Sequence, residues 1–278
     1  MAYTTQFAKC CTSHSNTPTI TMITKKSPKE IELLRVGGAI LAQILERLGS
    51  EAQPGVSTLT LDDIAMELAQ EHGVQPVLLG YHPEFADTPY PAAVCVSVNN
   101  CVQHGIPSED IILEEGDVVN IDMSISHEGM IVDSGITVGV GQIDDQARKL
   151  IEVTREALAL GVKAAQPGNH IGDISAAVQA LVESRGFSVV EVLCGHGVGY
   201  AVHEEPNIPN HGRAGTGPLI EVGHVYAIEP IVNIGKPDVT FDDEGDGYSV
   251  YTDDGSWSAH FEHTVAITED GPLVLTKK

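Results

Sequence analysis

The sequence predicts an α+β domain built from two similar halves. Its 278 residues fall within the range of one compact unit, and its 42% hydrophobic and 19% charged residues are typical of a globular protein. Ala-Gln-Pro-Gly occurs at 52–55 and again at 165–168, and each copy is followed by an amphipathic helical pattern and a glycine. A helix, helix, strand, hairpin unit used twice would bring two halves face to face.

Two further matches keep the same order along the chain. Gly-Asp-Val-Val-Asn-Ile-Asp at 116–122 is echoed by Gly-His-Val-Tyr-Ala-Ile-Glu at 223–229, and His-Gly-Ile-Pro at 104–107 by His-Gly-Val-Gly at 196–199. Chance similarity between helix and turn signals would not readily preserve the order of three matches. We therefore expect both halves to contribute acidic residues to the seam between them.

Helix signals open the first half. Ser27 and Glu30 form a capping box around a proline at the first helical position, and leucine and isoleucine then recur at helical spacing until the chain nears Pro54. A second helical pattern covers about 60–71 and is followed by Gly73, in the usual place of a C-terminal glycine. These patterns predict a long amphipathic helix and then a shorter one.

Strand signals come next, at 94–98 and in a predicted β-hairpin at 118–140. Both arms of the hairpin are rich in β-branched side chains, and a His-Glu-Gly turn at 127–129 joins them. In such a hairpin Asp122 and Asp133 project from the same side, opposite or diagonal to each other. Two adjacent like charges destabilise a sheet unless the face is wet, a proton is shared or a cation lies between them.

Three more polar residues lie in unusual surroundings. Glu229 and Glu262 each interrupt a hydrophobic run, and burying such a charge is costly unless it is paired, protonated or bound to a metal. His196 lies in a glycine-rich loop that allows close backbone approach. Taken singly, solvent-facing aspartates and a satisfied core histidine are the more frequent arrangements. Four acids together with an imidazole favour a metal site.

Four carboxylates and one imidazole can hold two divalent cations about 3.5–4 Å apart, with two of the carboxylates bridging. This oxygen-rich set suits Mn²⁺, Fe²⁺ or Co²⁺ better than a structural zinc, and such a pair would activate water for hydrolysis of an acyl bond. The signatures GxSxG, HExxH and GxGxxG and the Walker loop do not occur. Cys194, beside His196, offers an alternative nucleophile.

Charge and composition argue against several classes of partner. The net charge of −24 disfavours non-specific binding to nucleic acid or anionic lipid, and no apolar run approaches the roughly 20 residues of a membrane helix. The five cysteines form no CxxC pair, which fits a reducing cytosol. Residues 1–21 carry no acid and are rich in serine and threonine, and we expect a flexible extension there.

At this point the residues resemble the type I methionine aminopeptidases, members of the pita-bread group that includes prolidases and creatinase. The resemblance runs from about residue 22 onwards, so we expect one catalytic domain over 22–278. It implies two βα halves related by a pseudo-two-fold axis, with an antiparallel sheet core and helices outside. The matching stretches are Gln103–Pro107, Val119–Ser124, Val132–Gly135, Cys194–Gly199, Val202–Pro206, Ala227–Val232 and Phe261–Thr264.

The resemblance implies a role for each metal ligand. Asp122 would bind one cation, and Asp133 and Glu262 would bridge both. His196 and Glu229 would complete the second site. The cofactor would be a pair of divalent ions, with Co, Mn, Fe and Zn as the candidates.

Three residues are implied in catalysis. Glu229 would accept the proton of the attacking water. His104 and His203 would contact the scissile peptide without binding metal, and His203 would position or donate to the developing tetrahedral oxygen. A free amine held next to a Lewis acid explains why such an enzyme cuts only at an N-terminal residue.

The resemblance also implies a pocket for the methionine side chain. A soft apolar lining suits an unbranched thioether. Val202 and Tyr248 stand where bacterial relatives usually carry phenylalanine and tryptophan, and Pro83–Pro89 resembles an insertion between two pocket tyrosines. We therefore expect the pocket, rather than the hydrolytic site, to differ from these relatives. The implied lining residues are Tyr81, Tyr90, Cys95, His104, Val202 and Tyr248.

The expected activity is removal of the initiator methionine from nascent proteins, with preference for a small second residue. The expected partner is the N-terminus of a nascent polypeptide at the ribosome, and we expect a cytoplasmic monomer without nucleic-acid or membrane partners. Two alternatives keep the fold. One is an Xaa-Pro aminopeptidase or prolidase, whose relatives usually carry an extra N-terminal domain, and the other is a non-enzymatic binding protein.

Overall fold

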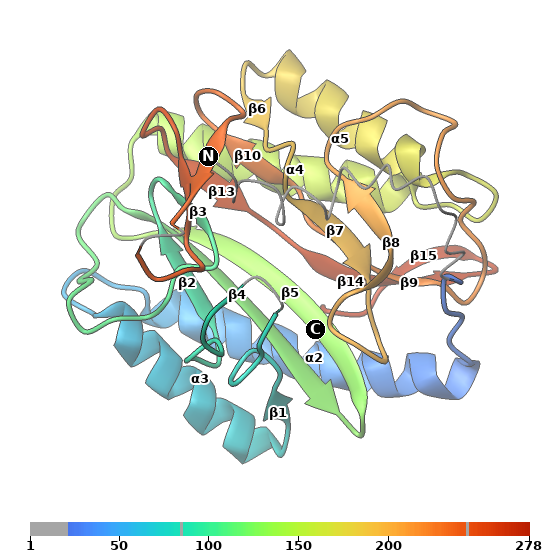
Figure 1. The fold of residues 1–278 in the computed structure, drawn as a ribbon, viewed down its shortest axis with the longest axis horizontal. Helices are drawn as coiled ribbons and strands as arrows, with labels where there is room; N and C mark the ends of the chain where they lie inside the picture. Colours follow the sequence, from blue (N-terminus) through green and yellow to red (C-terminus); the bar gives the residue numbers. More distant parts are fainter. Residues whose placement is uncertain (1–21, 84–85, 243–244) are drawn as a thin grey trace.

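Strands occupy the middle of the protein, and pairs of helices cover two opposite sides of them (Figure 1). The computed structural model describes residues 22–83, 86–242 and 245–278. The expected flexible extension at 1–21 lies outside the described residues, as do residues 84–85 of the expected insertion. The helices are α2 (Pro28–Glu51), α3 (Thr58–His72), α4 (Asp145–Ala164) and α5 (Ile171–Ser184).

The sequence signals place the helix ends well. Ser27 and Glu30 form the predicted capping box, in which each side chain accepts a hydrogen bond from the other residue's backbone. The second helix begins at Thr58, two residues earlier than expected, because the Ser57 side chain caps it by accepting from the backbone of Thr60. Gly73 ends it with φ 66°, a conformation that glycine adopts without steric cost.

Within the described ranges, the strands form four small sheets. The largest has the order β15-β14-β9-β7-β8, and another contains β1, β2, β4 and β5. The remaining sheets are β13-β10-β6 and β11-β12-β3, and all pairings are antiparallel. The bounds are β1 (Gln75–Pro76), β2 (Cys95–Val98), β3 (Cys101–Gln103), β4 (Val118–His127), β5 (Met130–Gly139), β6 (Ser188–Val189), β7 (Cys194–Gly197), β8 (Glu204–Pro209), β9 (Val225–Ile228), β10 (Ile231–Asn233), β11 (Val239–Phe241), β12 (Val250–Thr252), β13 (Ser258–His260), β14 (His263–Thr268) and β15 (Gly271–Val274).

The hairpin predicted in the first half is present as β4 and β5. The two strands pair without interruption from Val118 opposite Gly139 to His127 opposite Met130. Glu128 and Gly129 form the two-residue turn, and both have positive φ, as the turn types that join twisted antiparallel strands require. The hairpin therefore holds its register along its whole length, and we call it the first hairpin.

The second half contains a corresponding but interrupted hairpin. β9 pairs with β14, and β10 pairs with β13, so the segment 225–233 runs antiparallel to 258–268. Both paired parts keep one register, but the ladder breaks between them at Glu229-Pro230 and Phe261-Glu262. Proline has no backbone N–H to give to a ladder. We call this pair of segments the second hairpin.

Hydroxyl groups join the two hairpins along a seam between β5 and β13–β14. Thr264 Oγ1 donates to the carbonyl oxygen of Asp133 at 2.7 Å and accepts from the backbone N–H of the same residue at 2.9 Å. Ser134 Oγ donates to the carbonyl oxygen of Glu262 at 2.7 Å, and Thr137 bonds both backbone groups of His260. These contacts fix the two acidic faces against each other.

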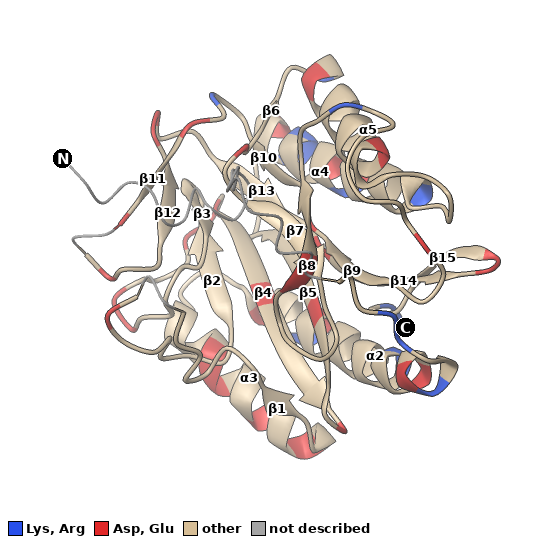
Figure 2. Ribbon diagram, turned by 45° about the vertical axis from the view of Figure 1, so that its right-hand side comes forward, with Lys and Arg blue, Asp and Glu red and all other residues tan. Residues whose placement is uncertain are grey.

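Separate apolar clusters support the two sides of the seam. α2 and α3 bury leucines such as Leu41 and Leu61 against Ile121 and other residues of the first hairpin. On the opposite side, α4 and α5 bury Val153 and Val178 against the second hairpin. Figure 2 shows acidic residues along α3 and in outer loops, and further acidic segments within β4 and β5 at the centre. Most acidic residues of a protein face solvent, and the acids of β4 and β5 at the centre are exceptions.

Candidate metal centre

The first hairpin places two aspartates on one face. Asp122 pairs with Gly135 and Asp133 pairs with Ser124, so the aspartates are diagonal neighbours across β4 and β5. This confirms the geometry predicted from the two-residue turn. Asp133 is buried, with 6% of its surface exposed. Two acids so close together need a counter-charge or a proton.

The second hairpin brings two glutamates to the point where its ladder breaks. The shared register of its two paired parts places Glu229 opposite Glu262. Both residues are buried, at 6% and 2% exposure. The backbone N–H of Glu262 donates to the carbonyl oxygen of Gly135 at 2.9 Å, so this glutamate lies directly on the seam beside the aspartates. Four carboxylates thus converge from both halves.

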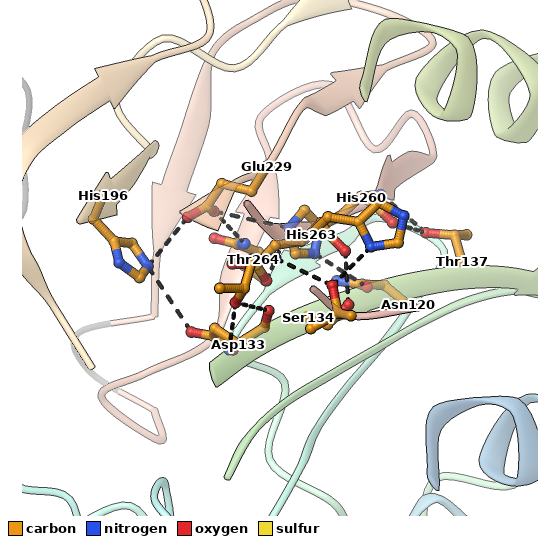
Figure 3. A network of polar contacts seen from close by, with 12 residues as sticks. Asn120, Asp133, Ser134, Thr137, His196, Glu229, His260, His263 and Thr264 are labelled. Atoms are coloured by element: carbon orange, nitrogen blue, oxygen red, sulfur yellow. Dashed lines mark hydrogen bonds and ion pairs between the residues drawn. The ribbon is translucent and has the colours of Figure 1, made fainter. Parts of the chain in front are cut away.

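His196 completes the set expected from the sequence. Its Nε2 atom lies 3.5 Å from Glu229 Oε1 and 3.9 Å from Asp133 Oδ2 (Figure 3). The other ring nitrogen, Nδ1, lies 3.0 Å from the carbonyl oxygen of Gly197, which can only accept a hydrogen bond. The proton is therefore on Nδ1, and the lone pair of Nε2 faces the carboxylates, as in a metal-binding histidine.

Two groups of side chains have donor atoms close enough to share a cation. Asp133, His196 and Glu262 form one group, and Asp122, His260 and Glu262 form the other, with the donor atoms of each group within 4.8 Å of one another. Glu262 belongs to both groups, the position expected of a bridging ligand. Four of the five predicted ligands fall in these groups, and the fifth, Glu229, contacts His196.

The electrostatics of the cluster call for positive charge. Burial raises the pKa of the Asp122 carboxyl well above its ordinary value, and the charge of Asp133 raises it further. The pKa of Glu262 is also well above its ordinary value, first through burial and then through Asp133, Asp122 and Glu229. Without cations the cluster would hold protons, and divalent cations would allow all of its carboxylates to ionise.

The histidines of the site are held neutral. Burial lowers the pKa of His196 to about 4 and that of His260 to about 3. Burial likewise lowers the pKa of His104 to about 4, and the neighbouring His203 adds to the effect. Neutral imidazoles are the form that binds metal or accepts a proton.

The residues present fit a pair of divalent cations. Asp133 Oδ1 and Glu262 Oε1 are buried and have no hydrogen-bond partner within the described part of the chain. Leaving such oxygens unsatisfied is costly, and a cation removes the cost. The donors are carboxylates and imidazoles, a mixture suited to first-row divalent metals rather than to a thiolate-bound zinc.

The two histidines expected to contact substrate lie beside the cluster. The ring of His203 is 4.5 Å from that of His196, centroid to centroid, and its Nδ1 is 3.2 Å from the Tyr81 hydroxyl. His203 is exposed, so a peptide can reach it. His104 follows β3 with φ 58°, a left-handed conformation that is uncommon outside glycine and is frequent at functional sites.

The residues expected to line a methionine pocket fall in two places. Tyr90, Cys95 and Tyr248 form one buried apolar cluster, in which the two tyrosine rings meet edge to face at 5.0 Å. Cys95 pairs with Asp122 across β2 and β4, so this cluster adjoins the carboxylates. Tyr81 instead contacts His203, and Val202 is the neighbour of His203 in the chain.

Sequence reasoning missed three polar residues at the centre. Gln103 Nε2 donates to Glu229 Oε2 at 3.1 Å, and Asn120 Oδ1 lies 3.3 Å from His260 Nδ1. His260 itself belongs to one of the two donor groups. The period of two along a strand could have found it, because His260 stands two residues before Glu262.

Known proteins resemble this chain over most of its length. The model of metallopeptidase family M24 matches residues 32–269. A methionine aminopeptidase from Aquifex aeolicus is 43% identical over 253 residues, which cover 90% of this chain and 97% of that protein.

None of the helices in the described residues combines the length and apolar character that crossing a bilayer requires.

Solved structures match over the same region. A methionine aminopeptidase from Thermotoga maritima superposes with a TM-score of 0.88 and 39% identity, covering 92% of this chain and all of that one (100%). An Xaa-Pro dipeptidase from Bacillus anthracis matches with a TM-score of 0.71 and 22% identity, covering 92% of this chain but 62% of its own. The second likeness concerns the fold alone.

Proposed function

Since the chain belongs to metallopeptidase family M24 and has the pita-bread fold, we propose that it removes the N-terminal methionine from newly made proteins. The relatives that match at about 40% identity over most of both chains are named methionine aminopeptidases. The observation that carries the proposal is the buried cluster in which Asp122, Asp133, Glu229 and Glu262 meet His196.

We assign the cluster two divalent cations. Asp122 would hold one, His196 and Glu229 the other, and Asp133 and Glu262 both. Such a pair lowers the pKa of bound water and polarises a carbonyl group. The shared position of Glu262 and the unsatisfied oxygens of Asp133 and Glu262 support two cations rather than one.

The chain's own residues would move the proton and position the peptide. Glu229 would accept the proton of the attacking water, and Gln103, which donates to its Oε2, would orient its carboxylate. His203 would donate a hydrogen bond to the oxygen that becomes negative during attack, and its Nδ1 contact with Tyr81 would hold the ring in place. His104, a neighbour of His203, would contact the peptide bond.

The methionine side chain would enter the apolar cluster next to Asp122. Tyr90, Cys95 and Tyr248 offer aromatic and sulfur surfaces that suit a thioether. Tyr90 and Tyr248 both use their hydroxyls elsewhere, on Gly105 and Thr88, so the rings present mainly apolar surface. With Tyr81, His104 and Val202 they form the proposed specificity pocket.

The proposed partner is the free N-terminus of a nascent chain. Because nascent chains carry the initiator methionine, we propose action in the cytoplasm, at the ribosome. All five proposed ligands come from one chain, so the site needs no second copy and we propose a monomer. The proposed catalytic domain spans 22–278.

Release of free methionine from Met-Ala-Ser tests the function. EDTA treatment should abolish release, and Mn²⁺, Fe²⁺ or Co²⁺ should restore it to different degrees. Met-Leu-Ser should be cut more slowly, because we expect a small second residue to be preferred. Preference for an Ala-Pro peptide would identify a prolidase instead, and metal binding without hydrolysis of any peptide would identify a binding protein.

A further inference from the structure

The imidazole of His260 is fully buried among the carboxylates of the metal centre. Its exposure is 0%, and its Nε2 lies 3.8 Å from Glu229 Oε2 and 3.9 Å from Glu262 Oε2 (Figure 3). These distances exceed a hydrogen bond. Two donor atoms that each lie about 2.1 Å from one cation are about 3–4 Å apart, so the distance to Glu262, the proposed bridging ligand, suits ligands of a common metal. The donor atoms of Asp122, His260 and Glu262 all lie within 4.8 Å of one another.

The Nε2 atom of His260 has no hydrogen-bond partner in the described part of the chain. Leaving a buried ring nitrogen without a hydrogen-bond partner costs free energy, and such atoms are rare in folded proteins. The carboxylate oxygens of Glu229 and Glu262 lie beyond hydrogen-bond distance from it. The position of Nε2 suits a cation that would lie between this nitrogen and the carboxylates.

The orientation of the ring is fixed at its other nitrogen. Nδ1 of His260 lies 3.3 Å from Asn120 Oδ1, and an amide oxygen can only accept, so Nδ1 carries the proton. The lone pair of Nε2 then points into the cluster. Thr137 holds the backbone, since its hydroxyl donates to the His260 carbonyl at 2.6 Å and accepts from the His260 N–H at 2.9 Å. A metal-binding histidine needs such support.

The first hairpin leaves room for this ring. Gly135 lies opposite Asp122, and a Cβ atom added to Gly135 would stand 2.7 Å from His260 Cε1. Cβ atoms essentially never make contacts this short, so a side chain at this position would displace the buried His260 ring. The glycine thus lets a histidine of the second half reach the aspartate of the first half.

We propose that His260 is a sixth protein ligand, which binds the cation held by Asp122 through Nε2. This inference rests on the proposed dinuclear site and deepens it. Each cation would then have one imidazole, His196 on one side and His260 on the other. A nitrogen donor on the Asp122 cation would favour Co²⁺, Fe²⁺ or Zn²⁺ there over Mn²⁺, which prefers oxygen ligands.

Proton NMR of the full-length protein with two equivalents of Co²⁺ tests the assignment without measuring activity. Each coordinated histidine gives one strongly shifted, solvent-exchangeable ring N–H resonance. Nδ1 is the protonated atom in both His196 and His260, and each is hydrogen-bonded. We expect two such resonances. One resonance would overturn the assignment of His260 alone, whereas the failure of Co²⁺ to bind would overturn the dinuclear site as well.

Two variants separate binding from packing. His260→Asn keeps a polar atom near Asn120 but lacks Nε2, and His260→Gln fills more of the ring volume. Both variants should lose one exchangeable resonance. Calorimetry should show that their affinity for the second Co²⁺ falls by about 10–100-fold, and that their affinity for Mn²⁺ falls less. If the two variants bind Co²⁺ as the unchanged protein does, His260 is not a ligand.

His263→Asn is the matched control. His263 adjoins Glu262 in the chain, but its Nδ1 contacts Thr276 Oγ1 at 2.9 Å, away from the donor groups. This variant should keep both resonances and the affinity for the second Co²⁺. A loss equal to that of His260→Asn would show that any change near Glu262 disturbs the site, and the assignment would fail.

Discussion

The two hairpins supply the proposed metal ligands in different ways. The first hairpin pairs without a break and carries Asp122 and Asp133 on regular strand positions. The second is split, and Glu229 and Glu262 lie where its ladder stops. A regular strand fixes side chains by its period of two, whereas a break frees backbone and side chain for other contacts. The first hairpin therefore presents a regular acidic face, and the second places its glutamates against that face at the break in its ladder.

The largest effect expected from this comparison is on Glu229, in the second hairpin. Glu229→Gln should reduce turnover of Met-Ala-Ser by several orders of magnitude, because it removes both a ligand and the proposed base. The fold should persist, since an amide of the same shape relieves the crowding of negative charge. The measurement is kcat at saturating metal, with the melting temperature as the check on folding.

Asp122→Asn is the matched change in the first hairpin. Asp122 is proposed to hold one cation and has no proposed part in proton transfer, so excess Co²⁺ or Mn²⁺ should restore part of the lost activity. Excess metal should not restore the Glu229 variant. Near-normal turnover of Glu229→Gln in metal-replete buffer would show that Glu229 is not the base. Equal rescue of both variants by excess metal would show that the two hairpins do not differ in this respect.

The same contrast explains what the sequence could and could not predict. Asp122 and Asp133 follow from a two-residue turn and strand alternation, which are local. Glu229 and Glu262 could be singled out only as acids in apolar runs, because their pairing depends on a connection that itself contains β11 and β12. The spacing of two residues from Glu262 is a local signal for His260, but its contacts could not be predicted because Asn120 and Gly135 belong to the other half.

For the fold, as for the site, the sequence predicted the local features and not the long-range ones. The ends of α2 and of the first hairpin rest on capping and turn chemistry within a few residues, and the structure confirms them. The repeated motifs indicated two halves, but they did not predict that the second hairpin would be interrupted at Pro230, which has no backbone N–H to give to a ladder. Its two parts join different sheets, and only long-range packing decides that.

A smaller effect is expected for His203, which stands outside both hairpins. His203→Ala should lower kcat by roughly 10²–10⁴, the range for a positioned proton-transfer or hydrogen-bonding group. Metal content should not change, because His203 is not a proposed ligand. Steady-state kinetics and metal analysis check the two parts separately. A defect as large as that of Glu229→Gln, or a loss of metal, would mean that its role is misassigned.

The smallest expected effect is on the stability that the proposed cations add by bridging the two hairpins. In the metal-free protein the pKa values of Asp122 and Glu262 are raised, mainly by burial, so these carboxyls keep protons that a cation must displace. Raised folded-state pKa values mean that the metal-free protein loses stability as pH rises towards them, while cation binding strengthens over the same range. The stabilisation by Co²⁺ should therefore grow as the pH rises from the ordinary pKa range of carboxyl groups towards the raised pKa values of Asp122 and Glu262.

Melting temperatures with and without Co²⁺, at a fixed free concentration, measure this growth. Both forms unfold to the same chain, so the titration of histidines in the unfolded state cancels from the difference. At 100 times the dissociation constant the gain is about 2.7 kcal/mol, and it should shrink as the pH falls. Asp133→Asn, which removes one charge from the seam, should show a smaller gain and a shallower rise. A gain that stays constant with pH would mean that the carboxylates are already ionised without metal, and the cations would then not be what brings the two acidic faces together.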